Sequence, residues 1–198
     1  MVDEIRAAGG QAAATYGSVT DDDAAKAMVQ CAVDNFGRLD ILINNAGILR
    51  DRSFKNMTDA EWDAVIDVHL RGAYLATKQV WAALLEQGEG GRIIMTSSTS
   101  GLIGNFGQAN YGAAKAGLAG FMRVLALEGM KYGITVNVLA PAALSRMTED
   151  LMPDTPELAE SMARAGVIRQ QVNDEKRDAE WVARQLASTG RLSTATKG

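Results

Sequence analysis

Short apolar runs alternate along the chain with longer stretches in which apolar residues recur at helical spacing. Three runs are suited to β-strands: Leu39–Ile43, Arg92–Ser97 and Ile134–Ala140. The first is a short, largely apolar run of the kind that strands buried on both faces of a sheet carry. Strands that alternate with helical stretches are typical of parallel sheets. The pattern therefore predicts an α/β fold in which helices cover a parallel sheet.

Helix boundaries are marked by capping residues and by glycines. Thr20 is expected to cap a helix that runs to about Phe36, where Gly37 ends it. Thr58 and Glu61 have the spacing of a capping box. The other elements that the pattern predicts are a helix end at 2–8, a weak strand at Ala12–Tyr16, a helical stretch from 58 to about 86, and a helix from about 110 to 129.

Beyond Pro141 the pattern becomes less regular. Apolar residues recur at loosely helical spacing over 144–168, and residues 169–184 are dense in charge. We expect residues 153–198 to form a divergent helical segment that ends in a frayed tail. The whole chain, 1–198, is expected to form a single domain.

Composition narrows the functional classes. The chain has 198 residues, of which 47% are hydrophobic, enough to bury a sizeable core. A net charge of −4 argues against a nucleic-acid partner. Cys31 is the single cysteine and cannot form an internal disulfide, which fits a reducing compartment. No apolar run approaches the ~20 residues that cross a bilayer. We therefore expect a cytoplasmic protein with no membrane partner, and we expect no metal site.

Tyr111 and Lys115 are one helical turn apart, and Ser98 lies upstream of them at the end of a predicted strand. Residues at i and i+4 share a helix face, so the Lys115 ammonium can lie near the Tyr111 hydroxyl. A positive charge there favours the phenolate and makes the tyrosine a usable general acid or base. The Ser98 hydroxyl can reach the same point and hydrogen-bond a substrate oxygen. On these three residues alone, a helix face that carries Tyr and Lys without a catalytic role explains the pattern as well as an active site does.

The surrounding motifs carry a resemblance to a known family. They are NNAG at 44–47, Ser98, YGAAK at 111–115 and NVLAP at 137–141, in that order. Over residues 1–152 the chain resembles the short-chain dehydrogenases/reductases. The segments AGILRDRSF (46–54), GNFGQANY (104–111) and SRMTE (145–149) further resemble the (3R)-hydroxyacyl-CoA dehydrogenase domain of peroxisomal multifunctional enzyme type 2 and related bacterial proteins. The resemblance implies a Rossmann-like, doubly wound parallel sheet.

The resemblance also implies an oxidoreductase that transfers a hydride between NAD or NADP and an alcohol or ketone, with a 3-hydroxyacyl thioester as the expected substrate. Its implied catalytic residues are Ser98, which holds the substrate oxygen, Tyr111, which exchanges the proton, and Lys115, which supports the tyrosine. His69 stands where the family usually has an asparagine of its catalytic tetrad, and we assign it a supporting role. Packing of this histidine against a neighbour is the alternative.

The implied cofactor residues are Asn45, Ala46 and Gly47, which follow the first strand, together with Tyr111, Lys115 and Pro141. Asn and Gly also favour a tight turn, so the first three have that alternative role. In the family the two long helices, which begin near 58 and near 110, pair between subunits. The chain is therefore expected to form a homodimer or tetramer, and packing of these helices against their own sheet is the alternative.

One part of the family pattern is missing from the sequence. The family begins with a strand, a Gly-x-x-x-Gly-x-Gly turn, a helix and a second strand, and this chain carries none of them. The sheet is expected to lack its first two strands, which leaves Leu39–Ile43 as an apolar edge. Either Met1 is not the true start, or another polypeptide supplies the missing part, or the chain is a non-catalytic remnant that dimerises or acts as a scaffold.

Overall fold

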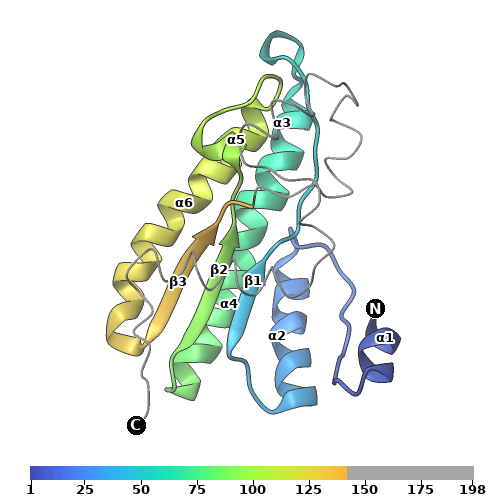
Figure 1. Cartoon of the computed structure of the whole chain (residues 1–198), viewed down its shortest axis with the longest axis vertical. Helices are drawn as coiled ribbons and strands as arrows, with labels where there is room; N and C mark the ends of the chain where they lie inside the picture. The colour runs from blue at the N-terminus through green and yellow to red at the C-terminus, as the bar shows by residue number, and fades with distance from the viewer. Residues whose placement is uncertain (142–198) are drawn as a thin grey trace, which may run out of the picture. The chain divides into compact units, whose positions relative to one another are not determined.

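The computed structural model describes residues 1–141 (Figure 1). Residues 142–198 lie outside the described part, so the predicted helical segment 153–198 and the single domain 1–198 stay predictions. The helices and helical turns are α1 (Val2–Ala7), α2 (Asp22–Phe36), a 3-10 turn (Phe54–Asn56), α3 (Asp59–Ile66), a π-helical turn (Asp67–Arg71), α4 (Gly72–Gln87), α5 (Thr99–Leu102), α6 (Ala109–Gly129) and a second 3-10 turn (Met130–Tyr132).

Three strands form one parallel sheet in the order β1-β2-β3. In this sheet Ile43 lies beside Ile94, which in turn lies beside Asn137. The strands form at the three predicted places, and the parallel α/β architecture confirms the predicted fold class. Their bounds are Ile41–Asn44 for β1, Gly91–Thr96 for β2 and Ile134–Leu139 for β3.

Helix α2 begins one residue later than predicted. Its N-cap is Asp21 and not Thr20: the Asp21 carboxylate accepts a hydrogen bond from the backbone N–H of Asp23 at 2.9 Å. A carboxylate here satisfies a free N–H group and also lies at the positive end of the helix dipole. Thr20 instead shares a hydrogen bond with the Ser18 hydroxyl. Gly37 ends the helix in the left-handed conformation, with φ of +77°, as predicted.

The weak strand predicted at Ala12–Tyr16 is not formed. The strand order leaves β1 at an edge, and within residues 1–141 no strand pairs with its outer side. A strand needs a neighbour that takes up its backbone N–H and C=O groups. The segment has no such neighbour here, and the Ala12 carbonyl instead accepts hydrogen bonds from the Arg6 guanidinium at 2.8 and 3.2 Å.

The predicted helical stretch from Thr58 is formed, with one interruption. Thr58 and Glu61 make the predicted capping box at the start of α3. Between α3 and α4 the backbone widens into the π-helical turn Asp67–Arg71. Such turns are rare and often occur at functional sites. This one carries His69, which is the chain's single histidine.

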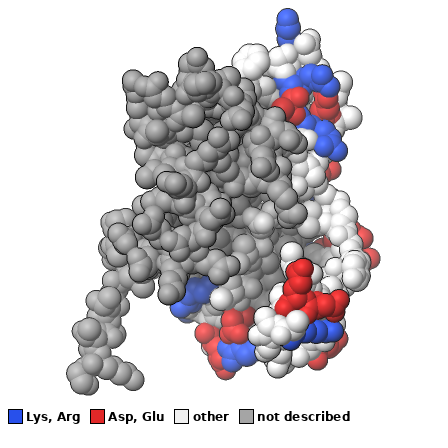
Figure 2. All heavy atoms as spheres, turned by 45° about the vertical axis from the view of Figure 1, so that its right-hand side comes forward, with Lys and Arg blue, Asp and Glu red and all other residues white. Residues whose placement is uncertain are grey.

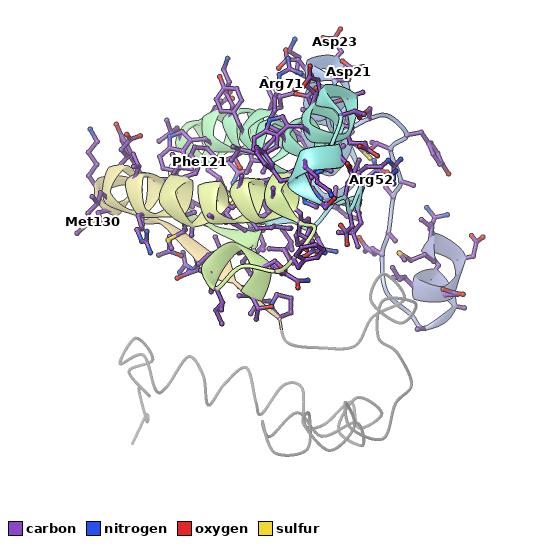
Figure 3. All side chains as sticks on the ribbon, turned by 90° about the horizontal axis from the view of Figure 1, so that it is seen from above. Asp21, Asp23, Arg52, Arg71, Phe121 and Met130 are labelled. Atoms are coloured by element: carbon purple, nitrogen blue, oxygen red, sulfur yellow. The ribbon has the colours of Figure 1, made fainter. Side chains whose placement is uncertain are left out.

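Alternate residues of the strands are buried and exposed. Ile41 and Ile43 of β1 are 58% and 60% exposed, whereas Leu42 between them is buried. The prediction that this strand is buried on both faces is therefore wrong. The physical reason is that α2, α4 and α6 lie on one side of the sheet (Figure 3), and none of the long helices of the described residues lies on the other. The core between helices and sheet contains Leu42, Val80, Leu84, Ile93, Met95, Leu118, Ile134 and Val136.

On the described part of the face in Figure 2, charged side chains of both signs are mixed. Arg38, for example, forms ion pairs with Asp40 at 2.6 Å and with Glu89 at 2.8 Å. Such exposed pairs contribute little to stability individually. In residues 1–141 we find no helix that is both long enough and apolar enough to span a membrane.

Candidate active site

The carboxyl ends of the three parallel strands lie at one edge of the sheet and bring most of the predicted residues together. β1 leads into 45–47, β2 into Ser97 and Ser98, and β3 into Pro141. Ligands of open α/β sheets bind at this edge. Pro141 is exposed there as the last described residue. Helix α6 reaches the same edge, because Lys115 contacts the end of β2.

Lys115 is buried, with 4% of its surface exposed. Its ammonium donates a hydrogen bond to the Thr96 carbonyl at 2.5 Å, and its Nζ lies 5.4 Å from the centre of the Tyr111 ring. Burial, which disfavours the charged form, lowers the pKa of Lys115 to about 8. The predicted juxtaposition of the two residues is thus present. Among the described residues the ammonium hydrogen-bonds to the backbone of β2, and it lies over the ring of Tyr111.

The residues on either side of Ser98 contact helix α6 at Lys115. Ser98 is the N-cap of α5, where its Oγ accepts a hydrogen bond from the Ser100 N–H at 3.2 Å. The buried Ser97 hydroxyl donates to the Lys115 carbonyl at 2.7 Å. Gly101 packs so closely on α6 that a Cβ there would lie 2.7 Å from the Lys115 carbonyl carbon. Among the described residues the Ser98 hydroxyl only accepts a hydrogen bond, so its own O–H remains able to donate to a ligand oxygen.

His69 packs against Tyr111, and is buried with 3% of its surface exposed. The two rings are T-shaped, with centroids 5.1 Å apart and planes at 89°. Nε2 lies 2.8 Å from the Ile48 carbonyl and 3.0 Å from the Ile48 N–H, while the buried Nδ1 has no partner among the described residues. Desolvation is the main cause that lowers the pKa of His69; the Ile48 carbonyl opposes it and the Lys115 charge adds to it. The ring is therefore neutral at pH 7.

The segment after β1 borders a cavity of about 80 Å³ beside the end of the strand. Asn45, Ala46, His69 and Lys115 are among its lining residues, with apolar side chains from α2 and α4. Gly47 contributes in a different way, because a Cβ at this position would collide with Cε1 of His69. Asn45, Ala46 and Lys115 therefore line one cavity, whereas Gly47 packs against the histidine; the cofactor-binding role of these residues stays a prediction.

Two polar residues of this region were not anticipated. Asn110 is fully buried and hydrogen-bonds to Tyr111 and to two backbone carbonyls. Gln108, also buried, donates to Asp51 at 2.8 Å and accepts from the Ser100 hydroxyl at 2.7 Å. The sequence did contain a signal for their role. Two carboxamide residues, Gln108 and Asn110, shortly precede Tyr111 at the start of a helix, where free backbone N–H groups need partners.

The chain matches known proteins over most of its length. Residues 1–156 match the family model described as short chain dehydrogenase. The peroxisomal hydratase-dehydrogenase-epimerase of Neurospora crassa is 52% identical over 168 residues, which cover 85% of this chain and 18% of that protein. The 3-oxoacyl-acyl-carrier-protein reductase of Synechocystis is 45% identical over 152 residues, covering 76% of this chain and 61% of the relative.

A solved structure is similar in both fold and sequence. The crystal structure of a short chain dehydrogenase from Mycobacterium avium superposes with a TM-score of 0.71 at 48% identity. The match covers 77% of this chain and 54% of the other. The chain thus spans only part of the length of these relatives.

Proposed function

Because this chain belongs to the short-chain dehydrogenase family, we propose that it catalyses reversible hydride transfer between a nicotinamide cofactor and an alcohol or ketone carbon. One observation supports this above all. The buried ammonium of Lys115 lies 5.4 Å from the centre of the Tyr111 ring, at the edge of the sheet where ligands bind.

The chain's own residues supply the proton chemistry. The Tyr111 hydroxyl gives its proton to the substrate oxygen when a ketone is reduced, and takes it back when an alcohol is oxidised. The Ser98 hydroxyl, which is free to donate, hydrogen-bonds the same oxygen and polarises the carbonyl. The Lys115 charge stabilises the phenolate that forms. His69 supports the ring of Tyr111 from its edge.

A bound NAD or NADP would supply or accept the hydride. The cavity beside β1 is lined by Asn45, His69 and Lys115, whose side chains carry an amide, an imidazole and an ammonium group. Amide, ammonium and imidazole groups all hydrogen-bond to sugar hydroxyls. These residues fit the ribose part of the cofactor. We assign Ala46, Gly47, Tyr111 and Pro141 to the same binding region.

The proposed substrate is a 3-hydroxyacyl thioester or its 3-oxo form. The relative from Synechocystis is named as a 3-oxoacyl-acyl-carrier-protein reductase. The two segments that resemble hydroxyacyl-CoA dehydrogenases, 46–54 and 104–111, lie together in the fold. The Arg52 N–H donates to the Gly107 carbonyl at 2.8 Å, and Gln108 donates to Asp51 at 2.8 Å. Tyr111 is the last residue of the second segment, so the joined segments can contribute to substrate selection beside it.

We also propose that a second copy of the chain binds across α4 and α6, as a homodimer or as half of a tetramer. Phe121 lies on the side of α6 that faces α4 (Figure 3), with its ring 6.5 Å from that of Tyr74. Beyond this contact Val124 and Leu127 of α6 are 54% and 72% exposed. Light scattering tests this: Leu127→Glu should yield a monomer, and an unchanged mass contradicts the interface. A cytoplasmic location also stays a prediction, since several relatives are named peroxisomal.

Turnover of 3-hydroxybutyryl-CoA with NAD or NADP tests the proposed reaction. We would assay the chain, and the chain joined to the upstream strand, glycine turn, helix and strand of a relative. Tyr111→Phe should lower kcat by about 10²–10⁴ with cofactor affinity unchanged, whereas Tyr132→Phe should leave it unchanged. If Tyr111→Phe keeps more than about a tenth of the rate, the assigned role is wrong. Absence of turnover in both forms favours the scaffold alternative.

A further inference from the structure

Asn110 is buried at the start of α6, and every hydrogen of its carboxamide is used. It is 0% exposed. Its Nδ2 donates to the Arg50 carbonyl at 3.1 Å and to the Glu61 carbonyl at 3.0 Å. Its Oδ1 accepts from the backbone N–H of Tyr111 at 2.8 Å. A carboxamide has two N–H donors, so this side chain has no donor left over.

The bond to Tyr111 takes the place of a helix cap. The first N–H groups of a helix have no partner within it. The N-cap residue of α6, Gln108, makes no capping bond with its side chain, which is engaged elsewhere. The Asn110 oxygen therefore satisfies the free N–H of Tyr111 from within the first turn. This fixes the backbone from which the phenol ring projects.

The two donor bonds tie that turn to separate parts of the fold. The Arg50 carbonyl belongs to the segment after β1, two residues beyond Ile48, which binds His69. The Glu61 carbonyl belongs to the first turn of α3. One carboxamide thus joins the start of α6, the segment that holds the His69 ring, and the helix that leads into the π-helical turn.

We propose that Asn110 is a positioning residue for Tyr111. By locking the first turn of α6 to the 48–52 segment and to α3, it sets the place of the phenol relative to His69 and Lys115. The kinetic consequence rests on the proposed role of Tyr111 in proton transfer, whereas the effect on the ring's position does not. Misplacement of a reacting group by about 1 Å can cost on the order of 10²-fold in rate.

Asn110→Asp is the sharpest variant, because it keeps the shape and the acceptor but loses both donors. Asn110→Ser is a second variant that keeps a small polar side chain should the first fail to fold. Asn105→Asp is the matched control, since the Asn105 carboxamide N–H donates to Gln108 at 3.2 Å in the same loop, but Asn105 is exposed and makes no hydrogen bond to Tyr111.

The first measurement is NMR of ¹³C-labelled tyrosine in the full chain, with the Tyr111 signal among the four tyrosines assigned from Tyr111→Phe. Either Asn110 variant should move the Tyr111 signal and leave the other three in place, and Asn105→Asp should move none. In the cofactor-binding form, which is the chain joined to the upstream strand, glycine turn, helix and strand of a relative, either Asn110 variant should lower kcat by about tenfold or more. The KM for cofactor should stay within about twofold. A lower melting temperature with the Tyr111 signal and kcat unchanged overturns the proposal. The NMR result stands even if the enzyme proposal fails.

Discussion

The imidazole of His69 meets the ring of Tyr111 edge-on, with the centroids 5.1 Å apart and the planes at 89°. Edge-to-face contact is a favoured geometry between aromatic rings. The histidine is itself fixed through Nε2 to the backbone of Ile48, and Gly47 leaves the space that its Cε1 occupies. The segment after β1 therefore reaches Tyr111 through one buried ring.

Replacement of Gly47 by alanine tests the contact between Gly47 and His69. The φ of Gly47 is not positive, so the backbone tolerates alanine and the collision with His69 decides the outcome. Gly47→Ala should destabilise the fold by about 1–3 kcal/mol, as overpacking does. In a His69→Ala background the same change should cost less by about 1 kcal/mol or more. Urea unfolding of the four proteins measures this coupling.

Gly120→Ala is the control for the alanine change. Gly120 lies within α6, and a Cβ there meets nothing within 4 Å. Alanine should stabilise the helix at this place by about 0.5–1 kcal/mol. Equal costs of Gly47→Ala with and without the imidazole would show that the two residues are not in contact.

The charge state of His69 should make stability depend on pH. Desolvation lowers its pKa in the folded protein below the ordinary 6.5. Between that folded value and 6.5 the unfolded chain binds more protons, so stability falls as the pH falls through this window. His69→Asn should remove that loss. Because this is the single histidine, proton NMR of its ring measures the pKa directly, and a value at or above 6.5 contradicts the expectation.

The strands and long helices of residues 1–141 could be predicted from periodicity and caps, because those signals are local. Gly37 and the pair Thr58–Glu61 mark boundaries that the structure has. The segment Ala12–Tyr16 could not be judged in this way. Whether it becomes a strand depends on a neighbouring strand, and its own residues carry no information about that. The exposure of Ile41 and Ile43 could not be predicted either, because it depends on whether another element covers that face of the sheet.

The site was predictable where spacing fixes geometry. The i,i+4 spacing of Tyr111 and Lys115 dictates a shared helix face, and the structure has it. The partners of Asn110 could not be predicted, since its two acceptors are backbone carbonyls, which every residue carries. The π-helical turn around His69 likewise has no sequence signature among the capping and periodicity signals.

Lys115→Met should damage both the rate and cofactor binding in the cofactor-binding form. The methionine fills similar space but lacks the charge beside Tyr111 and the donor at the cavity. The loss of the charge also disfavours the phenolate, so the pH–rate profile should move to higher pH. An unchanged profile together with unchanged cofactor affinity would remove Lys115 from the site.

Lys115→Met should also change how the stability of the fold depends on pH above about pH 8. Burial lowers the pKa of Lys115 to about 8 in the folded protein, against 10.5 for an exposed lysine. Between these values the unfolded chain binds more protons, so stability should rise with pH from about 8 to about 10.5. Lys115→Met should lack this rise. Denaturant unfolding at pH 7.5, 8.5 and about 9.5 compares the two slopes, and parallel curves contradict the lowered pKa.

The 198-residue polypeptide by itself should bind nicotinamide cofactors weakly and associate with itself. Its sequence offers no glycine-rich turn with a helix N-terminus to hold the pyrophosphate. In the sheet of residues 1–141, β1 is an edge strand whose Ile41 and Ile43 are 58% and 60% exposed. An apolar edge of this kind invites pairing with other strands.

Cofactor fluorescence and size-exclusion chromatography check both parts of this prediction. Joining the upstream strand, turn, helix and strand of a relative should restore binding and reduce association. Ile41→Lys in the 198-residue chain should reduce association alone, since a charge on the open face opposes pairing but adds no phosphate site. Tight, saturable binding of NADH or NADPH by a soluble monomer or dimer of the unextended chain would show that the residues present hold the whole cofactor. The polar groups of Asn45, His69 and Lys115 would then be the first place to look for its contacts.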